Sequence, residues 1–349
     1  MRKLNIAIIG LGNIGSYLFN YLKVNKKILT EKNNCQPLIK YVSAKNKGRK
    51  RKIKINKNQW LNNYLDATKK KDVDLIIELI GGAEGAAKKL VFNALKNKKH
   101  VVTANKALIA KYGDELSKIA ERNKVNLEFE ASVCGGVPII RSLKEGLIAN
   151  KISKIYGIFN GTSNYILSSM DKQNKGFDEV LSNAKKLGYA ESNPSADLNG
   201  DDVSSKLKIL SSLCFNSFLN NNIYVEGIKG IDKTDIDNAN KLGFKIKLLG
   251  FAEIINNRIY QRVHPTLIKK DSYVASIDGV LNAVIIDGKP VGQSIIQGEG
   301  AGPAATTSAL VSDISSILRG NIKFPFSLSN KERKKLIFDN IHDRFFSAY

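Results

Sequence analysis

A short apolar run that leads directly into closely spaced glycines is the feature that most restricts the fold of this chain. Residues 3–10 (KLNIAIIG) are apolar and end at the first glycine of the motif Gly10-Leu11-Gly12-Asn13-Ile14-Gly15. Apolar residues then recur at helical spacing, which predicts a strand-to-helix turn. In such a turn Gly10 permits the bend, Gly12 admits a pyrophosphate to the backbone, and Gly15 lets helix and strand pack closely. The alternative is an ordinary glycine-rich turn, but the position after the first strand favours a dinucleotide site that includes Asn13 and Ile14.

Strand-like and helix-like segments continue to alternate beyond this motif. Further strands are predicted at 38–44, 73–80 and 100–103, with a helix near 84–97. Such alternation predicts an α/β fold with a right-handed, doubly wound, Rossmann-type parallel sheet.

The alternation of strand-like and helix-like segments ends near Glu130. It is interrupted by Gly135-Gly136-Val137-Pro138, and a helix-like stretch follows at 139–149. From 151 to 297, strand-like segments (151–160, 258–268 and 282–288) alternate with helix-like ones, which predicts an α+β substrate domain. A helix predicted at 304–319 is expected to return to the first domain. The predicted organisation is a dinucleotide-binding domain (1–135, completed by 300–320), a substrate-binding domain (136–299) and a C-terminal tail (321–349).

The net charge of +23 raises the question of nucleic-acid binding. Only residues 45–54 (KNKGRKRKIK) are densely basic, and the dispersed lysines fit a general compositional bias, so we expect no nucleic-acid partner. A positive surface would still attract an anionic small molecule.

Membrane and disulfide classes are disfavoured by the same sequence. Apolar runs such as 73–80 are far shorter than the roughly 18 residues a membrane span needs, and no signal-peptide pattern opens the chain. We therefore expect a cytoplasmic protein without a membrane partner. The three cysteines are far apart and lack CxxC spacing, so each is expected to be a small buried hydrophobe.

The end of the second predicted strand bears on cofactor choice. The stretch Tyr41-Val42-Ser43-Ala44-Lys45 lacks the carboxylate that normally holds the ribose 2′-hydroxyl of NAD. Lys45, Lys47 and Arg49 occupy this neighbourhood instead. They could clamp the 2′-phosphate of NADP, or they could form a solvated basic loop; we expect NADP to be preferred over NAD.

Two further segments carry residues suited to chemistry. Thr103-Ala104-Asn105-Lys106 follows the fourth strand, at the sheet edge where ligands bind in doubly wound folds, although a lysine there is commonly only a surface residue. In the segment 188–210, Asp202 and Lys206 stand four apart on one helix face. They could form a surface ion pair, or Lys206 could move a proton while Glu191 and Asp197 bind a substrate ammonium.

Taken together, these segments resemble the homoserine dehydrogenases over residues 1 to about 320. Residues 188–210 are similar to the family signature GYAExxPxxDxxGxDxxxKLxIL. The other matching stretches are IELIGG (77–82), TANK (103–106), NGTSNY (160–165), RVHPTL (262–267) and GEGAG (298–302).

The resemblance implies reversible NAD(P)-dependent reduction of L-aspartate 4-semialdehyde to L-homoserine, in threonine, methionine and isoleucine biosynthesis, by a homodimer. It implies that Lys206 is the proton donor and acceptor and that Lys106 is a second active-site lysine. Asp202 would then be a substrate-binding partner in the same site. The remaining implied residues bind the amino-acid end (Glu191, Asp197), line the pocket (Gly161, Thr162, Tyr189) or lie near the cofactor (Gly188, Gly302). The alternatives are a related dehydrogenase of another amino-acid aldehyde and a non-catalytic dinucleotide sensor.

Two more expectations come from the resemblance. The stretch 130–138 is similar to the family's sodium site, which implies a structural Na⁺ bound by Glu130 and the main chain of Val133, Gly135 and Val137. Oxygen ligands suit such a hard cation. Only about 30 residues follow Arg319, so we expect a short form without the threonine-sensing ACT domain that many members carry.

Overall fold

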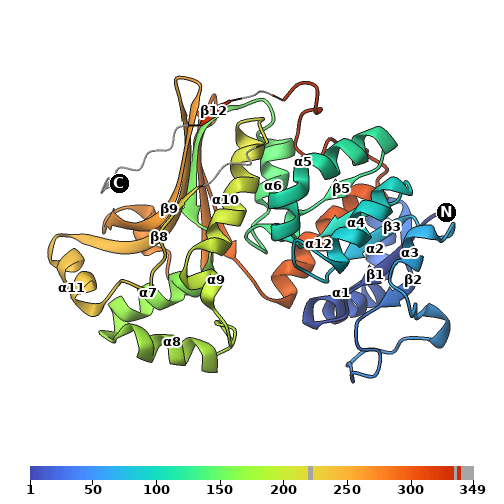
Figure 1. Cartoon of the computed structure of the whole chain (residues 1–349), viewed down its shortest axis with the longest axis horizontal. Helices are drawn as coiled ribbons and strands as arrows, with labels where there is room; N and C mark the ends of the chain where they lie inside the picture. The colour runs from blue at the N-terminus through green and yellow to red at the C-terminus, as the bar shows by residue number, and fades with distance from the viewer. Residues whose placement is uncertain (219–222, 334–335, 339–349) are drawn as a thin grey trace. The chain divides into compact units, whose positions relative to one another are not determined.

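The computed structural model describes residues 1–218, 223–333 and 336–338. It contains two compact units (Figure 1). Unit 1 comprises residues 1–144 and 302–333, and unit 2 comprises 145–301 with the described residues 336–338. The domain bounds expected from the sequence remain a prediction, because compactness alone does not show which segments fold independently.

Unit 1 is built on a five-stranded parallel sheet in the order β2-β1-β3-β4-β5, which confirms the predicted α/β fold class. The four expected strands are present, and β5 is a two-residue strand too short to predict from a pattern. The strands are β1 (Arg2–Ile9), β2 (Cys35–Ser43), β3 (Leu75–Glu78), β4 (His100–Thr103) and β5 (Leu127–Glu128). In this order β2 and β3 flank β1, so the ends of all three strands meet at the switch point where doubly wound folds bind ligands.

Helices cover this sheet, and α12 packs against α1 while α5 packs against α4. They are α1 (Asn13–Val24), α2 (Lys26–Asn33), α3 (Asp66–Lys69), α4 (Ala86–Lys96), α5 (Lys106–Asn123), α6 (Ile139–Arg141) and α12 (Pro303–Leu318). The helix expected at 139–149 is shorter than predicted, since α6 passes into a wider π turn over Ser142–Gly146. In this turn the Lys144 ammonium is buried against the Glu128 carboxylate at 3.0 Å, a tertiary contact that helical periodicity does not reveal.

The last helix completes the core of unit 1, as expected. Leu310 and Ile314 of α12 are fully buried in one cluster with Leu18 of α1 and residues of β1. Burying one such side chain is worth about 2 kcal/mol relative to exposure. The chain beyond α12 also packs on this unit: Phe326 is buried 5.1 Å from the ring of Phe129. The predicted tail is therefore integrated into unit 1 here, whereas residues 339–349 lie outside the described part of the chain.

Unit 2 contains a mixed seven-stranded sheet in the order β11-β10-β6-β8-β9-β12, with β7 beside β9. The strands expected at 151–160, 258–268 and 282–288 correspond to β6, β9 and β10. β8 was not anticipated; it pairs with β9 through a two-residue hairpin in which Asn256 and Asn257 both have positive φ. The strands are β6 (Lys151–Ile158), β7 (Tyr224–Val225), β8 (Phe244–Ile255), β9 (Arg258–Lys269), β10 (Leu281–Lys289), β11 (Gly292–Glu299) and β12 (Ile337–Phe338).

Helices pack against this sheet, with α7 contacting β8, and α10 contacting β6 and β8 (Figure 1). The helices of unit 2 are α7 (Gly161–Gln173), α8 (Phe177–Lys186), α9 (Ser195–Leu198), α10 (Asp201–Cys214) and α11 (Lys233–Lys241), of which α8 packs on α7 and α9 on α7 and α10. Val203, Leu207 and Leu210 form the buried stripe of α10 that the sequence predicts. This packing fixes the rotation of α10 and so decides where its polar residues point.

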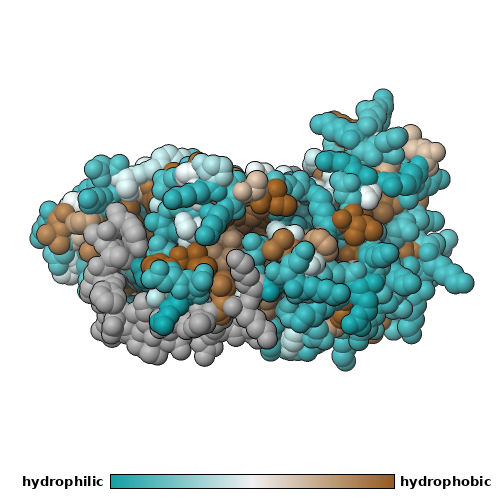
Figure 2. Space-filling view, turned by 90° about the horizontal axis from the view of Figure 1, so that it is seen from above, coloured by the Kyte–Doolittle hydropathy of each residue, from teal (hydrophilic) through white to brown (hydrophobic). Residues whose placement is uncertain are grey.

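The cysteines agree with the expectation from the sequence. All three are buried, and none takes part in a disulfide. Every helix among the described residues is too short or too polar to cross a membrane. The face shown in Figure 2 is largely hydrophilic, with apolar residues in small scattered patches.

Candidate functional site

The glycine motif forms a turn between β1 and α1 that leaves room on one side only. Gly10 has φ +107°, and a Cβ there would lie 2.4 Å from the carbonyl oxygen of Leu79. A Cβ on Gly15 would lie 2.0 Å from the carbonyl oxygen of Gly10, so helix and strand could not approach as they do. Gly12, in contrast, has no heavy atom within 4 Å of a Cβ position. The open space at Gly12 is what a pyrophosphate against the backbone requires.

A pocket of about 610 Å³ opens beside this turn, within the size range of small-molecule sites. Its walls come from the segments that follow β1, β2 and β3. The residues that line it include Gly10, Gly12, Ala44, Lys45, Arg49 and Arg51. Lys47, predicted to contact the cofactor, instead donates to Asn62 Oδ1 at 3.2 Å and lies over the Trp60 ring. Arg51 was overlooked at the sequence level, although it lies in the same basic run.

Thr103 is fully buried and acts within the fold of unit 1. Its hydroxyl donates to Glu78 Oε2 at 2.5 Å, while Glu78 Oε1 accepts from the N–H groups of Ile80 and Gly81 at 2.7 and 2.9 Å. Asn105 caps α5 and donates to the carbonyl oxygen of Gly82 at 2.8 Å. These bonds join the ends of β3 and β4 and place Lys106 at the first position of α5. The sequence analysis did not identify Glu78. An acidic residue at the end of a predicted buried strand could have indicated its role.

In unit 2, Asp202 and Lys206 form a buried pair on α10. Lys206 Nζ donates to Asp202 Oδ2 at 2.8 Å and to the carbonyl oxygen of Phe159 at 2.6 Å. Asp202 lies in the first turn of α10, where the helix dipole favours a carboxylate. Their side chains are only 5% and 10% exposed, so the reading of the pair as a surface ion pair is wrong.

Asn160 connects this pair to a second carboxylate. Its side-chain oxygen caps α7 by accepting from Ser163 N at 2.8 Å, and its Nδ2 donates to both Asp202 Oδ2 (2.8 Å) and Asp197 Oδ1 (2.7 Å). The predicted residues Asp197, Asp202 and Lys206 therefore belong to one hydrogen-bonded cluster, together with the unpredicted Asn160. We call these four residues the Lys206 cluster.

Residues at the start of α7 follow directly on Asn160 of the Lys206 cluster. A Cβ on Gly161 would lie 2.6 Å from the carbonyl oxygen of Val280, so only glycine fits. Thr162 Oγ1 donates to the carbonyl oxygen of Tyr189 at 2.7 Å. Glu191, in contrast, is exposed on the loop between α8 and α9, and Gly188 begins that loop with φ +77°.

A buried amide also supports the lysine and was missed at the sequence level. Asn282 Nδ2 donates at 2.9 Å to the same Phe159 carbonyl oxygen that accepts from Lys206. Asn282 Oδ1 has no hydrogen-bond partner within the described part of the chain. Its strand pattern gave no hint of this role, because its partner lies 123 positions away.

The predicted sodium ligands lie in a buried turn of unit 1. Glu130 is 1% exposed, and its two carboxylate oxygens accept from Ile140 N (2.9 Å) and Arg141 N (2.7 Å). Burial raises the pKa of Glu130 to about 7, against the opposing effect of these hydrogen bonds. Positive φ values at Cys134 and Gly135 turn the chain through the segment that carries the expected carbonyl ligands. Since no group of three or more acidic, His or Cys side chains among the described residues is arranged to hold a metal ion, a cation here would depend on Glu130 and main-chain oxygens.

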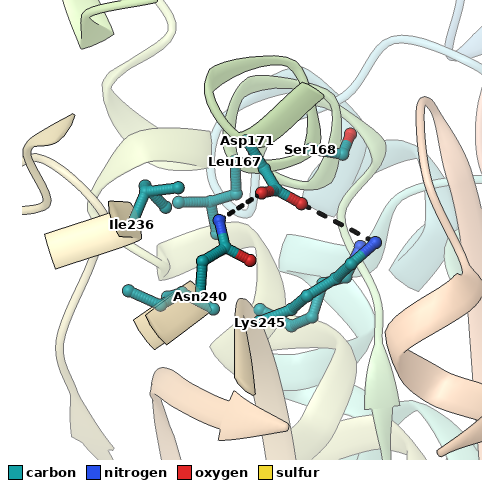
Figure 3. A pocket seen from close by; sticks show the side chains of 8 residues that line it. Leu167, Ser168, Asp171, Ile236, Asn240 and Lys245 are labelled. Atoms are coloured by element: carbon teal, nitrogen blue, oxygen red, sulfur yellow. Dashed lines mark hydrogen bonds and ion pairs between the residues drawn. The ribbon is translucent and has the colours of Figure 1, made fainter. Parts of the chain in front are cut away.

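A second polar cavity lies in unit 2, between α7, α11 and β8 (Figure 3). Its volume of about 10 Å³ has room for roughly one water molecule. Asp171 closes it by accepting from Asn240 Nδ2 at 2.6 Å and pairing with Lys245 at 3.6 Å. The cavity is too small for a substrate.

Two protein-family models match this chain. The family described as "Homoserine dehydrogenase" matches residues 138–315, and "Homoserine dehydrogenase, NAD binding domain" matches residues 10–130. The chain belongs to the homoserine dehydrogenase family. As a homoserine dehydrogenase it is an oxidoreductase of amino-acid biosynthesis that uses a nicotinamide dinucleotide, and the resemblance inferred from the sequence is confirmed.

Individual homoserine dehydrogenases support the assignment along nearly the whole chain. The enzyme of Neisseria gonorrhoeae is 41% identical over 320 residues, which cover 91% of this chain and 73% of that protein. The crystal structure of the Thiobacillus denitrificans enzyme has a TM-score of 0.90 at 37% identity and covers 97% of this chain and 80% of that one. A hyperthermophilic archaeal homoserine dehydrogenase solved in complex with NADPH shares the fold, with a TM-score of 0.75 at 24% identity, over 92% of this chain and 100% of that one.

Proposed function

We propose that Lys206 is the proton donor and acceptor with which this chain interconverts L-aspartate 4-semialdehyde and L-homoserine. The observation that carries the proposal is the buried Nζ atom, fixed by Asp202 at 2.8 Å and the Phe159 carbonyl at 2.6 Å. When bound, the nicotinamide dinucleotide would supply the hydride for reduction of the aldehyde carbon and would accept it from the alcohol carbon in the reverse reaction. The Lys206 ammonium protonates the oxygen during reduction, and neutral Lys206 removes that proton during oxidation.

The neighbours of Lys206 are assigned to orientation. Asp202 holds the ammonium through a charge-assisted hydrogen bond, and Asn160 fixes Asp202 from the other side. With the lysine already in one place, little entropy is lost when the substrate oxygen arrives.

The substrate's amino group is assigned to carboxylates of the same region. Asp197, half-buried and oriented by Asn160, would bind the ammonium, with Glu191 supplied by the adjoining exposed loop. Gly161, Thr162 and Tyr189 are proposed to line the pocket, and Lys106 to act as the second active-site lysine.

The cofactor is assigned to the pocket beside the glycine turn, and we infer a preference for NADP. Gly10, Gly12, Asn13, Ile14 and Gly15 would hold the pyrophosphate, since the turn leaves space at Gly12. The pocket wall after β2 offers Lys45 and Arg49. Basic groups there attract a 2′-phosphate, and the absence of a carboxylate at Ala44 removes a repulsion. We keep the proposal that the cofactor also contacts Thr103, Gly188 and Gly302. Arg49, rather than Lys47, is proposed to contact the phosphate directly, because Lys47 is hydrogen-bonded to Asn62.

The Glu130 turn is proposed to bind a structural Na⁺. A buried carboxylate together with main-chain carbonyls is a suitable donor set for a hard cation, with Val133, Gly135 and Val137 as the main-chain ligands. Sodium chloride should then raise the melting temperature more than potassium chloride at equal ionic strength. Glu130→Gln should abolish the difference, and an identical response of the wild-type protein to both salts would contradict the site.

A homodimer formed through unit 2 and a cytoplasmic location are also proposed, on the family resemblance alone. Sedimentation equilibrium of the purified chain measures the first: a single species at monomer mass over micromolar concentrations would exclude the dimer.

The decisive experiment is an assay of homoserine oxidation and aspartate 4-semialdehyde reduction with the purified chain. Lys206→Ala should lower kcat by ~10² to 10⁴-fold while dinucleotide binding stays intact. Lys208→Ala, two residues away on the same helix, serves as the matched control and should retain activity. Inactive wild-type protein with normal dinucleotide binding would favour the sensor, and turnover of a different amino-acid aldehyde would favour the related dehydrogenase.

A further inference from the structure

In the basic stretch 45–54, the side chain of Arg51 donates hydrogen bonds to main-chain carbonyl oxygens. Arg51 is half-buried, whereas residues 45–50 are exposed. Its Nε donates to the carbonyl oxygen of Leu11 at 3.0 Å, and Leu11 lies inside the glycine motif. Its terminal nitrogens donate to carbonyl oxygens of the basic stretch itself, those of Asn46 (2.7 Å), Arg49 (2.9 Å) and Lys47 (3.4 Å). The guanidinium thus ties the basic stretch to the glycine turn.

The ends of this loop are held by other contacts. Val42 bridges to Trp60, and Ser43 Oγ donates to the carbonyl oxygen of Leu61 at 2.9 Å. Between these ends the Arg51 guanidinium lies 5.5 Å from the centre of the Trp60 ring, so it also stacks within the loop. Arg51 therefore positions the middle of the loop, with a further contact from Lys47 to Asn62.

Arginine is suited to this task in a way that lysine is not. A guanidinium carries five N–H donors in a rigid planar fork, and Arg51 directs its donors to carbonyls of two separate chain segments. An ammonium is a compact point charge with three donors and cannot span the same set. With its donors committed to carbonyls, Arg51 is poorly placed to serve as the main ligand of a phosphate.

We infer that Arg51 is a positioning residue that couples two halves of the cofactor site. By holding the basic stretch against Leu11, it presents Lys45 and Arg49 to the 2′-phosphate and keeps the turn at Gly12 open to the pyrophosphate. This inference rests on the proposed preference for NADP. It adds that one arginine, without contacting the phosphate, controls both the affinity for the dinucleotide and the choice between its two forms.

Charge-conserving substitutions in the full-length protein test the coupling. Arg51→Lys keeps the charge but loses the fork, so the Kd of NADH should rise about tenfold and that of NADPH by more, since each charge-assisted hydrogen bond is worth roughly this factor or more and NADPH also loses the positioned Lys45 and Arg49. Arg49→Gln, the control for direct phosphate contact, should weaken NADPH alone. If Arg51→Lys weakened NADPH alone, Arg51 would be a phosphate ligand and the inference would be overturned.

Limited trypsin digestion of the cofactor-free protein gives a second readout that does not depend on activity. Arg51→Lys and Arg49→Lys both preserve the number of trypsin sites, so cleavage rates within 45–54 can be compared directly. Cleavage should be several-fold faster in Arg51→Lys and unchanged in Arg49→Lys. Wild-type cleavage rates in Arg51→Lys would overturn the coupling, whereas tighter NADH than NADPH binding by the wild-type protein would refute only the proposed cofactor preference.

Discussion

In the described part of unit 2, the pairs Lys206–Asp202 and Lys247–Asp278 have nearly the same local geometry, and both lysines are buried. Lys206 Nζ lies 2.8 Å from Asp202 and 2.6 Å from the Phe159 carbonyl oxygen. Lys247 Nζ lies 2.8 Å from Asp278 and 2.6 Å from the Ile277 carbonyl oxygen. A search for a buried lysine with a carboxylate would therefore return both sites.

Their surroundings differ in the charge around the carboxylate. Asp278 is also paired with Lys172 at 2.8 Å and lies 3.9 Å from Lys245, and Lys247 is 1% exposed. Asp202 is bonded instead to the neutral amide of Asn160, which holds a further carboxylate, and Lys206 is 10% exposed. The first arrangement is an ion-pair network in which three lysines surround one carboxylate; the second is a carboxylate-rich environment suited to an ammonium substrate. The comparison teaches that neighbouring charge and access, rather than the pair itself, separate a catalytic lysine from a structural one.

Replacing the two aspartates should separate the sites most clearly. Asp202→Asn should lower kcat by about 10²-fold, because Lys206 loses the group that orients it. Asp278→Asn should leave kcat within about twofold, since none of its ion-pair partners, Lys172, Lys245 and Lys247, belongs to the Lys206 cluster. Steady-state kinetics on both variants measures this, with dinucleotide Kd as a check on folding. Equal losses of kcat in the two variants would remove the distinction between the pairs.

Removing the buried amine at the second site should affect stability instead. Lys247→Met leaves Asp278, Asn164 and the Ile277 carbonyl without a shared donor, so urea unfolding should show a loss of about 3 kcal/mol. Lys245→Met, on the same strand face with a side chain 22% exposed, is the control and should lose less. A smaller loss in Lys247→Met than in Lys245→Met would mean that the network is not held together by Lys247.

The pH dependence of stability should also locate the network. Burial raises the pKa of Asp278, but hydrogen bonds from Lys172 and Lys247 outweigh it, so the net pKa is below its ordinary value. An aspartate of this kind stabilises the fold above its unfolded pKa of about 4, and the contribution disappears as pH falls through the lower folded value. The free energy of unfolding of Asp278→Asn should therefore be about 2 kcal/mol below wild type at pH 7, and the gap should narrow progressively as pH falls below about 4. A gap that kept its pH 7 size down to pH 2 would refute this origin.

The smallest expected effect is at the edge of the same network. Asn240 donates to Asp171 where α11 meets α7 (Figure 3), and Asn240→Ala should cost about 1 kcal/mol because Asn240 is only half-buried. Asn238→Ala, exposed on the same helix, should be nearly neutral. Thermal unfolding measures both, and no change in kcat is expected for either.

Local patterns predicted the parts of this protein whose partners are close in sequence. The glycine motif between β1 and α1 was readable because its spacing and the close approach of Gly15 to the Gly10 carbonyl oxygen lie within six residues. The four main strands of unit 1 were readable because buried parallel strands are continuous apolar runs. The placement of Asp202 and Lys206 on one helix face followed from helical periodicity alone.

Tertiary structure decided everything that depended on partners far along the chain. Whether Asp202 and Lys206 form a surface pair or a buried cluster was settled by Asn160 and the Phe159 carbonyl, more than 40 positions away. Arg51 meets Leu11 across 40 positions, and Lys247 meets Asp278 across 31. The physical reason is the same in each case: a polar side chain gains its role from the groups that replace water around it on burial, and sequence spacing does not encode those groups unless they lie on the same helix or turn.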